Sequence, residues 1–519
     1  MATEVELKYL VLNENVSKEI FTLLNDQQII FSHQIKKLSN CYFDTPDLAL
    51  RKMDMGLRIR SHNGHIEQTI KTAGVTIGGL HQRPEYNVDI QSSFPNLAFF
   101  PQEIWPQDKN IDLLQEQIVS LFSTDFTREI WTITFQKSEI EMAFDNGNIC
   151  SDGRSVDICE IELELLSGDK AALFELAKLL FASLKLRAGI NSKAARGYRL
   201  FAEKESNQVN TFDKSKISLE IKSDHQQVER YFQAGISHCL HQLQLSIEQY
   251  LTSQQLTELA DIVDVLSLIR HGFRLFAEKS ITNNDKVLDE LNHFMQQFAW
   301  VDNAIYLQEL MNKTGNYRKK LEYSEQLIDH LRIEKRRVPD VEMITELLHS
   351  ERFNLLQLTL LQLLLNDSQI DELFTIKSLD NQSFKNNRNE LFDFAKLKLS
   401  ESLTQLSDAM TLLPNADAEH YLENRQLLRR SLLTGHWFGS LFDPQERDRF
   451  KEPWLDMLLG LRELQSLWII KQQLEKLESS SERQNSKIIN WQHGKVDNLL
   501  LALEQTKQAA LAIPPYWLI

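Results

Sequence analysis

Hydrophobic and polar residues alternate with period two over several short segments of the first 200 residues. Residues 4–8 read Glu-Val-Glu-Leu-Lys, and residues 160–164 read Glu-Ile-Glu-Leu-Glu. In a β-strand this pattern puts the charged side chains on one face and the aliphatic side chains on the other. Similar alternation occurs at residues 42–45, 57–60, 67–71, 83–88, 128–133 and 139–144. The pattern predicts about eight strands, a number typical of a closed antiparallel barrel.

Two local features refine this expectation. Asp145-Asn146-Gly147 follows an alternating segment and predicts a hairpin turn before the next strand. Pro84 lies within another alternating segment. Because proline has no N–H group and removes a ladder hydrogen bond, we expect a bulge or an edge strand at this position.

After the polar stretch of residues 207–216, alternation gives way to leucine-rich segments with helical spacing, and glycine and proline become sparse. Examples are residues 254–276, 341–365, 391–413, 420–433 and 454–477. They predict an all-α bundle of roughly ten helices. The apolar segment at residues 513–519 either docks on this bundle or forms an exposed patch.

The expected fold class is therefore α+β, in two domains. An eight-stranded antiparallel β tunnel or barrel with flanking helices is predicted for residues 1–205, followed by a linker at residues 206–216. The all-α helical-bundle domain is predicted for residues 217–519.

Charge and composition limit the partners that this chain can have. The formal net charge of -16 argues against general nucleic-acid binding, because a surface that follows a phosphate backbone needs an excess of lysine and arginine. No apolar run approaches a membrane span, and the N-terminus lacks the basic and apolar regions of a signal peptide. We expect a cytoplasmic protein without a membrane partner.

Charged residues of both signs gather on the polar faces of the expected strands. One alternating strand alone is most simply explained as the solvated side of a half-buried sheet, but the second acidic strand favours a polar barrel lumen. The cations are Lys8, Arg58, Arg60, Lys71, Arg83 and Arg128. Several cations and several glutamates facing one lumen would repel within each group unless an anion and a metal ion came between them. A magnesium-bound polyphosphate would supply both.

The ordered set of motifs makes the interpretation more specific. It comprises Glu4-x-Glu6-x-Lys8, Tyr42–Thr45, Leu57–Arg60, Lys71, Arg83-x-Glu85, Arg128, Glu160-x-Glu162-x-Glu164 and Ser192–Tyr198. This set resembles the CYTH domain of the triphosphate tunnel metalloenzymes. The resemblance implies an eight-stranded tunnel that binds a small-molecule triphosphate end-on, with Mg²⁺ or Mn²⁺ as cofactor.

The resemblance also implies roles for individual residues. The metal-binding acids would be Glu4, Glu6, Glu160, Glu162 and Glu164, and catalysis would involve Glu4, Glu6 and Lys8. The phosphate-binding cations would be Lys8, Arg58, Arg60, Lys71, Arg83, Arg128 and Lys193. Three further acids, Glu85, Glu141 and Asp145, match acidic motif positions: Glu85 is a candidate metal ligand, and Asp145 a candidate turn residue.

The C-terminal part resembles the CHAD domain, a helical module associated with polyphosphate. The matching fragments are residues 268–276, 307–310 with 316–318, and 420–430. The sequence departs from the histidine-plus-basic motif of that family, because Asp264-Val265 stands where the first histidine of the motif is expected. We expect this domain to be a partner or regulator of the tunnel, with polyphosphate as a candidate ligand.

The function expected from these features is that of a metal-dependent inorganic triphosphatase. It would hydrolyse tripolyphosphate to pyrophosphate and phosphate by metal-assisted, in-line attack of water. No nucleophilic triad and no Walker-type glycine loop occurs in the sequence. The alternatives are an adenylate cyclase, a nucleoside, thiamine or RNA triphosphatase on the same fold, and a polyphosphate-binding module without catalysis.

Overall fold

The structure is a computed structural model, and its described residues form two compact units. The described residues are 2–13, 15–62, 64–202, 228–279, 285–312, 315, 317–322, 324–365, 384–411, 417–477 and 482–519. Residues 2–202 and 344–365 lie in the first unit, and residues 228–343 and 384–519 in the second. The predicted linker at residues 206–216 is outside the described residues.

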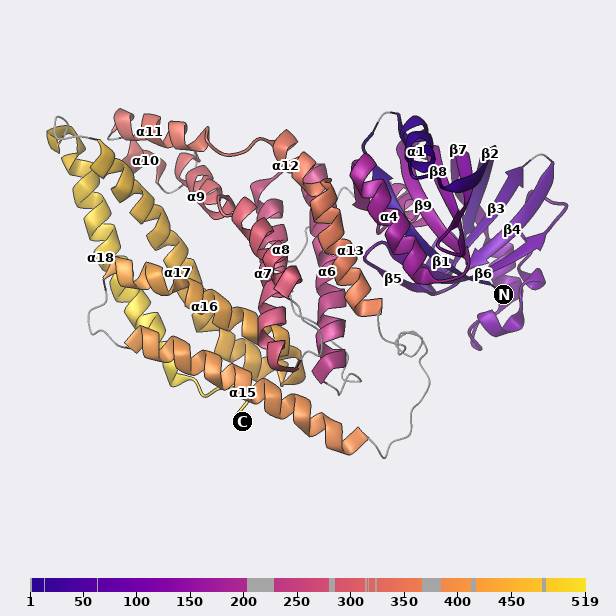
Figure 1. Cartoon of the computed structure of the whole chain (residues 1–519). Coiled ribbons are helices and arrows are strands. Elements are labelled where there is room, and N and C mark those ends of the chain that lie inside the picture. Colours follow the sequence, from indigo (N-terminus) through magenta and orange to yellow (C-terminus); the bar gives the residue numbers. More distant parts are fainter. Residues whose placement is uncertain are drawn as a thin grey trace. The chain divides into compact units, whose positions relative to one another are not determined.

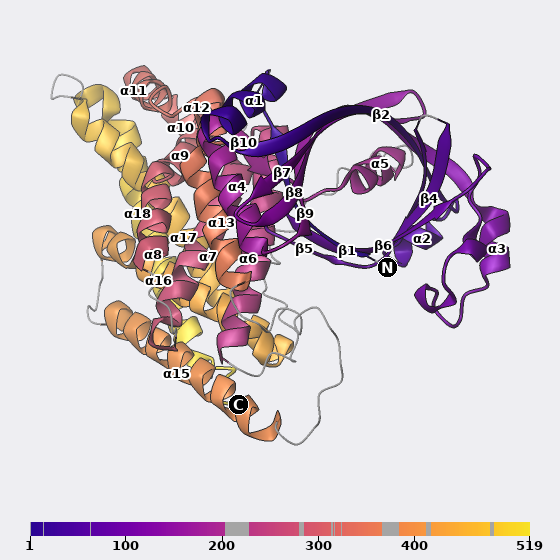
Figure 2. The same ribbon diagram turned by 45° about the vertical axis from the view of Figure 1, so that its right-hand side comes forward.

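An antiparallel sheet closes on itself in the first unit and surrounds helix α5 (Lys193–Ala202) (Figure 2). Its strands are β1 (Ala2–Val11), β2 (Ile30–Asp44), β3 (Gly56–His62), β4 (His65–Lys71), β5 (Val75–Ile77), β6 (Leu80–Asp89), β7 (Val119–Phe135), β8 (Ser138–Ser151), β9 (Arg154–Ser167) and β10 (Leu186–Ala188). They neighbour one another in the order β10-β1-β9-β8-β7-β2-β3-β4-β6-β5, and β1 also pairs with β6. Among the described residues, eight strands therefore make the predicted ring, with the short β5 and β10 attached to it.

The alternation of the first strand divides its side chains between the two faces of the sheet. Leu7 lies opposite Leu163 of β9, and both side chains are fully buried. Glu6 and Lys8, on either side of Leu7, line a cavity inside the ring. The period-two pattern thus produces a hydrophobic outer face, covered in part by helix α4 (Lys170–Ser183), and a charged inner face.

The predicted turn at Asp145–Gly147 is wrong, because these residues lie within β8. The hairpin between β8 and β9 instead turns at Asp152 and Gly153, whose φ values of 48° and 74° suit a tight turn. Gly147 is required for a different reason. A Cβ atom there would lie 2.2 Å from the carbonyl oxygen of Asp125 on β7, so only glycine fits this close approach.

The prediction of a bulge or edge at Pro84 holds for only one side of β6. Pro84 lies inside β6 and pairs with Thr3 of β1. On the other side of β6, the ladder with β5 ends at Gln82 and the ladder with β4 starts at Glu85. The proline therefore occupies a gap between two ladders, where its missing N–H group interrupts neither of them.

The remaining helices of the first unit come from two distant parts of the sequence. They are α1 (Val16–Asp26), α2 (Ala49–Lys52), α3 (Ile111–Gln117), α4, α5 and α13 (Glu351–Leu365). Helix α13 packs against α4 and β10. The buried Asn354 of α13 donates a hydrogen bond of 2.7 Å to the carbonyl oxygen of Leu186 in β10. Part of the predicted helical region thus completes the hydrophobic layer outside the ring.

The second unit is all-helical, as predicted (Figure 1). Its helices are α6 (Val228–Ser253), α7 (Leu256–Leu275), α8 (Asp285–Gln297), α9 (Val301–Met311), α10 (Arg318–Leu321), α11 (Glu325–Lys335), α15 (Phe384–Thr411), α16 (Ala418–Phe438), α17 (Pro444–Lys476) and α18 (Glu482–Ala512). Helix α12 (Val341–Leu348) spans the division between the units. None of the described helices carries a stretch long and apolar enough to cross a membrane.

Trp437 of α16 is fully buried at the centre of three helices of this unit. Its indole N–H donates a hydrogen bond of 3.0 Å to the carbonyl oxygen of Leu268 in α7. A Cβ atom on Gly235 of α6 or on Gly272 of α7 would lie 2.1 Å from the indole ring. The two glycines therefore let α6 and α7 close directly over the Trp437 ring.

The C-terminal segment docks on its own unit, the first of the two predicted alternatives. Tyr516 and Trp517 are buried, and the indole N–H of Trp517 donates a hydrogen bond of 2.9 Å to Ser400 of α15. Leu518 and Ile519, which follow, are exposed.

Candidate active site

A polar cavity of about 310 Å³ lies inside the ring of strands. Among the described residues that line it, eight are lysine or arginine: Lys8, Arg51, Arg58, Arg60, Lys71, Arg83, Arg128 and Lys193. Five are glutamate: Glu6, Glu85, Glu141, Glu162 and Glu164. The lining thus carries three more positive than negative charges, in a chain whose formal net charge is -16. Such an excess inside a closed ring favours an anionic ligand.

Three glutamates form a row across neighbouring strands on one side of the cavity. Glu6 of β1 lies directly opposite Glu164 of β9, and Glu164 lies directly opposite Glu141 of β8. All three side chains line the cavity. Like charges directly opposite one another repel, and a cation that binds between them relieves this repulsion. Carboxylate oxygens around a polar, water-accessible space are the ligands that Mg²⁺ and Mn²⁺ prefer.

Deeper in the wall, buried carboxylates are held by the chain's own cations. Asp145, Glu160 and Glu162 offer oxygen atoms that all lie within 4.8 Å of one another, a grouping that could also hold a metal ion. The ammonium group of Lys193 lies 2.6 Å from Asp145 and 2.9 Å from Glu162, and it also pairs with Glu160. Burial lowers the pKa of Lys193, but these three carboxylates more than offset it and raise the pKa above its ordinary value.

Arg128 makes the second link within this cluster. Its guanidinium binds both carboxylate oxygens of Asp145, at 2.7 and 2.6 Å, and an oxygen of Glu162 at 2.5 Å. Burial raises the pKa of Glu162, but Lys193 and Arg128 lower it well below its ordinary range. Glu162 therefore stays ionised in the wall of the cavity.

Glu160 is fully buried and does not line the cavity. Lys8 lies 2.6 Å from one of its oxygens, and Arg196 of α5 lies 2.7 Å from the other. Burial raises the pKa of Glu160, but Lys193, Lys8 and Arg196 lower it. In this structure Glu160 holds the cations Lys8 and Lys193 in position, and these two cations reach the cavity.

Helix α5 brings Lys193 and Arg196 to the inside of the ring. The hydroxyl of Ser192 accepts a hydrogen bond of 3.1 Å from the N–H of Ala195 and so caps the helix start. A Cβ atom on Gly197 would lie 2.1 Å from the ring of Phe122 on β7, so glycine allows α5 to approach that strand closely. Tyr198 packs edge-on against the same ring.

On the opposite side of the cavity, formed by β3, β4 and β6, lysines and arginines outnumber carboxylates. Glu85 of β6 pairs with Arg58 at 3.2 Å and with Lys71 at 3.0 Å. Arg60 donates through Nε to the side-chain oxygen of Asn40 at 2.9 Å, and it pairs with no carboxylate among the described residues. Burial, together with the charges of Arg58 and Arg128, lowers the pKa of Arg60 to about 10. A bound anion would relieve this repulsion.

The structure places the predicted residues as follows. The predicted cations Lys8, Arg58, Arg60, Lys71, Arg83, Arg128 and Lys193 all line the cavity, as do Glu6, Glu85, Glu141, Glu162 and Glu164. Glu160 and Asp145 lie in the buried cluster behind it. The backbone of Glu4 pairs with Arg83 in β1 and β6, but its side chain is outside the described part of the chain.

The sequence interpretation missed several lining residues without charge, and one further arginine. Asn40 was not identified, and Tyr42, which belongs to the motif at residues 42–45, was given no role. The two residues are two apart on β2, so the period-two pattern could have placed both in the lining. Nothing in the sequence pattern marks Arg51 or His81. His81 is buried, donates to the carbonyl oxygen of Gly189 at 2.9 Å, and has a pKa lowered to about 4 by burial and by Lys8.

In the helical unit, two arginines of α16 are paired with aspartates. Arg425 and Arg429 lie 2.8 and 2.9 Å from Asp302, and Arg429 also lies 2.9 Å from Asp264. Asp264, which stands where the predicted CHAD resemblance would have a histidine, therefore pairs with Arg429.

Residues 2–198 match the family model of the CYTH domain. This match confirms the resemblance that the motifs predicted for the N-terminal part of the chain. It ends before the helical region, so the resemblance of residues 217–519 to a CHAD domain stays a prediction.

A protein described as an inorganic triphosphatase from Haemophilus influenzae (strain ATCC 51907 / DSM 11121 / KW20 / Rd) is 38% identical over 201 residues. The alignment covers 38% of this chain and 55% of that protein, so the chain spans about half the length of this curated relative.

Two solved structures are also similar to part of the chain. The PH1819 protein from Pyrococcus horikoshii OT3 is 24% identical, with a TM-score of 0.24, and the match covers 39% of this chain and 99% of that one. The inorganic triphosphatase NE1496 is 18% identical, with a TM-score of 0.15, covering 33% of this chain and 79% of that one.

Proposed function

We propose that this protein is a metal-dependent inorganic triphosphatase that hydrolyses tripolyphosphate to pyrophosphate and phosphate inside the ring of strands. The observation that carries the proposal is the division of the cavity into a side rich in cations and a side with the acid row Glu6, Glu164 and Glu141. A linear triphosphate bound with a divalent cation carries negative charge that complements the first side and positive charge that complements the second. The CYTH match and the similarity to an inorganic triphosphatase support this choice.

The lysine and arginine side chains would bind the phosphate oxygens. Arg58 and Arg60 project from the same face of β3, two residues apart, and their guanidinium groups can each donate two parallel hydrogen bonds to a phosphate. Lys8 and Lys193 would act as point charges, held in place by the buried Glu160. The pKa of Arg60, lowered to about 10, still leaves its guanidinium charged at neutral pH.

The donor set of the acid row fits a hard divalent cation, Mg²⁺ or Mn²⁺, because it consists of carboxylates beside a water-accessible cavity. Glu6, Glu164 and Glu141 would hold the cation, with Glu4 and Glu162 as further candidates from the same strands. When bound, it would neutralise negative charge on the phosphate oxygens. The carboxylates of this wall would also orient a water molecule for in-line attack on the terminal phosphorus, and no covalent nucleophile of the chain is needed.

The ion-paired residues behind the wall would have a positioning role. Asp145, Glu160 and Arg128 are already bound to one another or to lysines. Their pairing fixes the directions of Lys193, Lys8 and Glu162, whose side chains reach the cavity. Pre-organised charges of this kind stabilise the developing charge of a phosphoryl transfer without further rearrangement.

Polyphosphate remains our candidate ligand for the helical unit. Arg270, Arg274 and Arg430 pair with no carboxylate among the described residues, and burial and the neighbouring arginines lower the pKa of Arg270. A chain of phosphates is one anion that could bridge these three cations. Arg274→Ala should weaken polyphosphate binding to the full chain in a filter-binding assay, whereas Arg332→Ala, at an exposed helix surface, should not.

The proposal is tested by measuring phosphate release from tripolyphosphate, ATP and thiamine triphosphate, with Mg²⁺, with Mn²⁺ and with a chelator. We expect metal-dependent turnover that is fastest for tripolyphosphate. The double variant Glu4→Gln/Glu6→Gln should lose this turnover, and Glu139→Gln, an exposed glutamate at the start of β8, should retain it.

Other outcomes would support the alternatives. Faster turnover of ATP or thiamine triphosphate would favour a nucleoside or thiamine triphosphatase, and formation of cyclic AMP would favour a cyclase. Binding of tripolyphosphate without any released phosphate would leave the binding module as the better account.

A further inference from the structure

His81 of β6 lies where three segments of the first unit meet. It lines the cavity beside the acid row, and its backbone lies directly opposite Glu6 of β1. Its buried side chain contacts β5 on one side and the segment that follows β10 on the other. A neutral imidazole in this position could act as a metal ligand, as a base, or as a link between segments.

Both ring nitrogens of His81 are engaged within the protein. Nε2 lies 2.9 Å from the carbonyl oxygen of Gly189, which can only accept, so Nε2 carries the proton and donates the hydrogen bond. Nδ1 therefore accepts, and the hydroxyl of Thr76 in β5 donates to it at 3.2 Å. A metal ligand or a base needs a lone pair that is not already used in a hydrogen bond. The imidazole therefore links β5 and β6 to the residue that follows β10.

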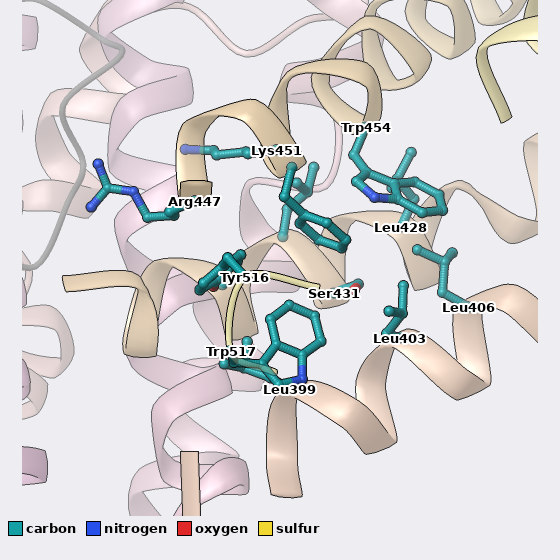
Figure 3. A pocket seen from close by; sticks show the side chains of 13 residues that line it. Leu399, Leu403, Leu406, Leu428, Ser431, Arg447, Lys451, Trp454, Tyr516 and Trp517 are labelled. Atoms are coloured by element: carbon teal, nitrogen blue, oxygen red, sulfur yellow. The ribbon is translucent and has the colours of Figure 1, made fainter. Parts of the chain in front are cut away.

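Such complete pairing is not general for buried polar groups beside the cavities of this chain. A cavity of about 40 Å³ lies in the helical unit, with Trp454 and Tyr516 in its wall (Figure 3). The indole N–H of Trp454 and the hydroxyl of Tyr516 have no hydrogen-bond partner among the described residues. A fully paired buried network holds its members in one arrangement, because a displaced group would lose its partner. His81 therefore holds the carbonyl group of Gly189 in one position.

Gly189 in turn lies against Lys8. Its N–H donates a hydrogen bond of 2.9 Å to the carbonyl oxygen of Lys8, whose own N–H donates to Gly79 at 2.9 Å. A Cβ atom on Gly189 would lie 3.0 Å from Cγ of Lys8 and 3.4 Å from its Cδ, so the glycine backbone runs directly beside the lysine stem. Because this backbone forms one wall around the stem, a shift of Gly189 would change the direction of the Lys8 side chain.

The same segment leads to the second buried ammonium group. Lys193 starts α5 a few residues after Gly189. Lys8 and Lys193 both pair with Glu160 and Glu162, and both lysines line the cavity. The carbonyl group that His81 holds is therefore connected to both of these cations, through packing to Lys8 and through the chain to Lys193.

We propose that His81 is a positioning residue for Lys8 and Lys193, acting through the hydrogen bond from its Nε2 to the carbonyl oxygen of Gly189. This inference rests on the proposed function, in which the two ammonium groups bind phosphate oxygens. With the hydrogen bond in place, both ammonium groups stay where Glu160 and Glu162 hold them. Without it, the segment between β10 and α5 can move away from β6, and the two cations no longer meet the same phosphate chain.

The test compares two substitutions of His81 in the full chain. His81→Met fills similar space without a donor, whereas the side-chain amide of His81→Gln can still donate to Gly189. With metal present, His81→Met should raise the KM for tripolyphosphate at least about tenfold, and His81→Gln should stay within about threefold of the unmodified protein. A loss of folded protein would lower the apparent kcat and leave KM unchanged, so KM separates positioning from stability. The control His65→Met, at an exposed histidine of β4 that pairs with Asp89, should keep the KM of the unmodified protein.

Hydrogen exchange provides a readout that needs no turnover. In peptides that span residues 186–193, the amide of Gly189 should lose protection in His81→Met, because its hydrogen bond to Lys8 is weakened, and keep it in His81→Gln. If the unmodified protein neither binds nor hydrolyses tripolyphosphate, the proposed function fails, and the exchange result alone decides whether His81 holds this segment.

Three results would overturn the proposal. They are an unchanged KM in His81→Met, an equal rise of KM in both His81 variants, and unchanged exchange of residues 186–193 in His81→Met. The second result would show that the imidazole itself is required, and not its hydrogen bond to Gly189.

Discussion

The interiors of the two units of this chain contain different kinds of side chain. The first unit encloses charge: Lys193, Arg128, Glu160 and Glu162 lie inside or directly behind the wall of its cavity. The second unit encloses hydrocarbon, with the fully buried Trp437 at its centre. Pairing of ions therefore organises the cavity of the first unit, whose strands also pack hydrophobic side chains on their other face, whereas the interior of the second unit depends on shape complementarity.

The largest expected effect comes from breaking the ion cluster of the first unit. Lys193→Met should lower the free energy of unfolding of this unit by about 3–5 kcal/mol, because three buried carboxylates lose their shared cation. Urea unfolding, followed by circular dichroism, measures the change. The control Lys178→Met removes a surface pair with Glu175 and should cost at most about 1 kcal/mol. An equal loss of unfolding free energy in the two variants would show that the ion cluster contributes no more to stability than a surface ion pair.

The matching change in the second unit adds volume rather than removing charge. Gly272→Ala should destabilise this unit by about 1–3 kcal/mol, because the new Cβ atom would lie 2.1 Å from the ring of Trp437. Gly494→Ala is the matched control in helix α18, where a Cβ atom meets nothing within 4 Å. It should stabilise by up to about 1 kcal/mol, since alanine favours the helix. Thermal unfolding of both variants tests the contrast, and a stable Gly272→Ala protein would contradict the close packing at Trp437.

A third prediction tests whether residues 344–365 belong to the first unit. Asn354→Ala should destabilise the first unit by about 1–3 kcal/mol, because the buried carbonyl oxygen of Leu186 loses its donor. Lys185→Ala removes an exposed ion pair with Glu346 near the same surface and should change stability by less than about 1 kcal/mol. Hydrogen exchange of β10 and α4 reports the effect locally. If β10 and α4 keep their protection from hydrogen exchange in Asn354→Ala, residues 344–365 do not contribute to the stability of the first unit.

A further predicted effect is a dependence of stability on pH that each unit owes to one buried histidine. The pKa of His81 in the first unit and that of His271 in the second are both lowered to about 4, chiefly by burial. The unfolded chain takes up a proton near pH 6.5, so protonation favours unfolding. The histidine contribution is complete above pH 6.5 and is lost as the pH falls towards 4.

Single variants assign this pH dependence. His81→Gln should flatten the pH dependence of urea unfolding between pH 6.5 and 4 in the first unit alone, and His271→Gln should do so in the second alone. An unchanged slope in both variants would show that other groups titrate in this range.

Much of the first unit could be predicted from the sequence, because strand alternation directly encodes which side chains face inward. Lys8, Arg58 and Arg60 line the cavity as the period-two pattern requires. Contacts that depend on distant segments could not be predicted. The pattern Asp145-Asn146-Gly147 has the composition of a turn, but the glycine is needed where β8 passes close to β7.

The buried cluster shows a further limit of sequence reasoning. Glu160 and Glu162 are two residues apart on one strand face and look equivalent in the sequence. In the structure Glu160 is fully buried between Lys8 and Arg196, while Glu162 reaches the cavity. The difference arises from helix α5, whose position inside the ring follows from packing at Gly197 and not from strand alternation.

The role of the acid row is the central claim, and the most direct test is the rate of metal-dependent phosphate release from tripolyphosphate by Glu164→Gln. Glu164 lies between Glu6 and Glu141 in the row, and the amide keeps its size while removing its charge. The account predicts that the rate falls to the level seen with chelator, whereas the control Glu139→Gln keeps the rate of the unmodified protein. Full activity of Glu164→Gln at the same metal concentration would contradict it.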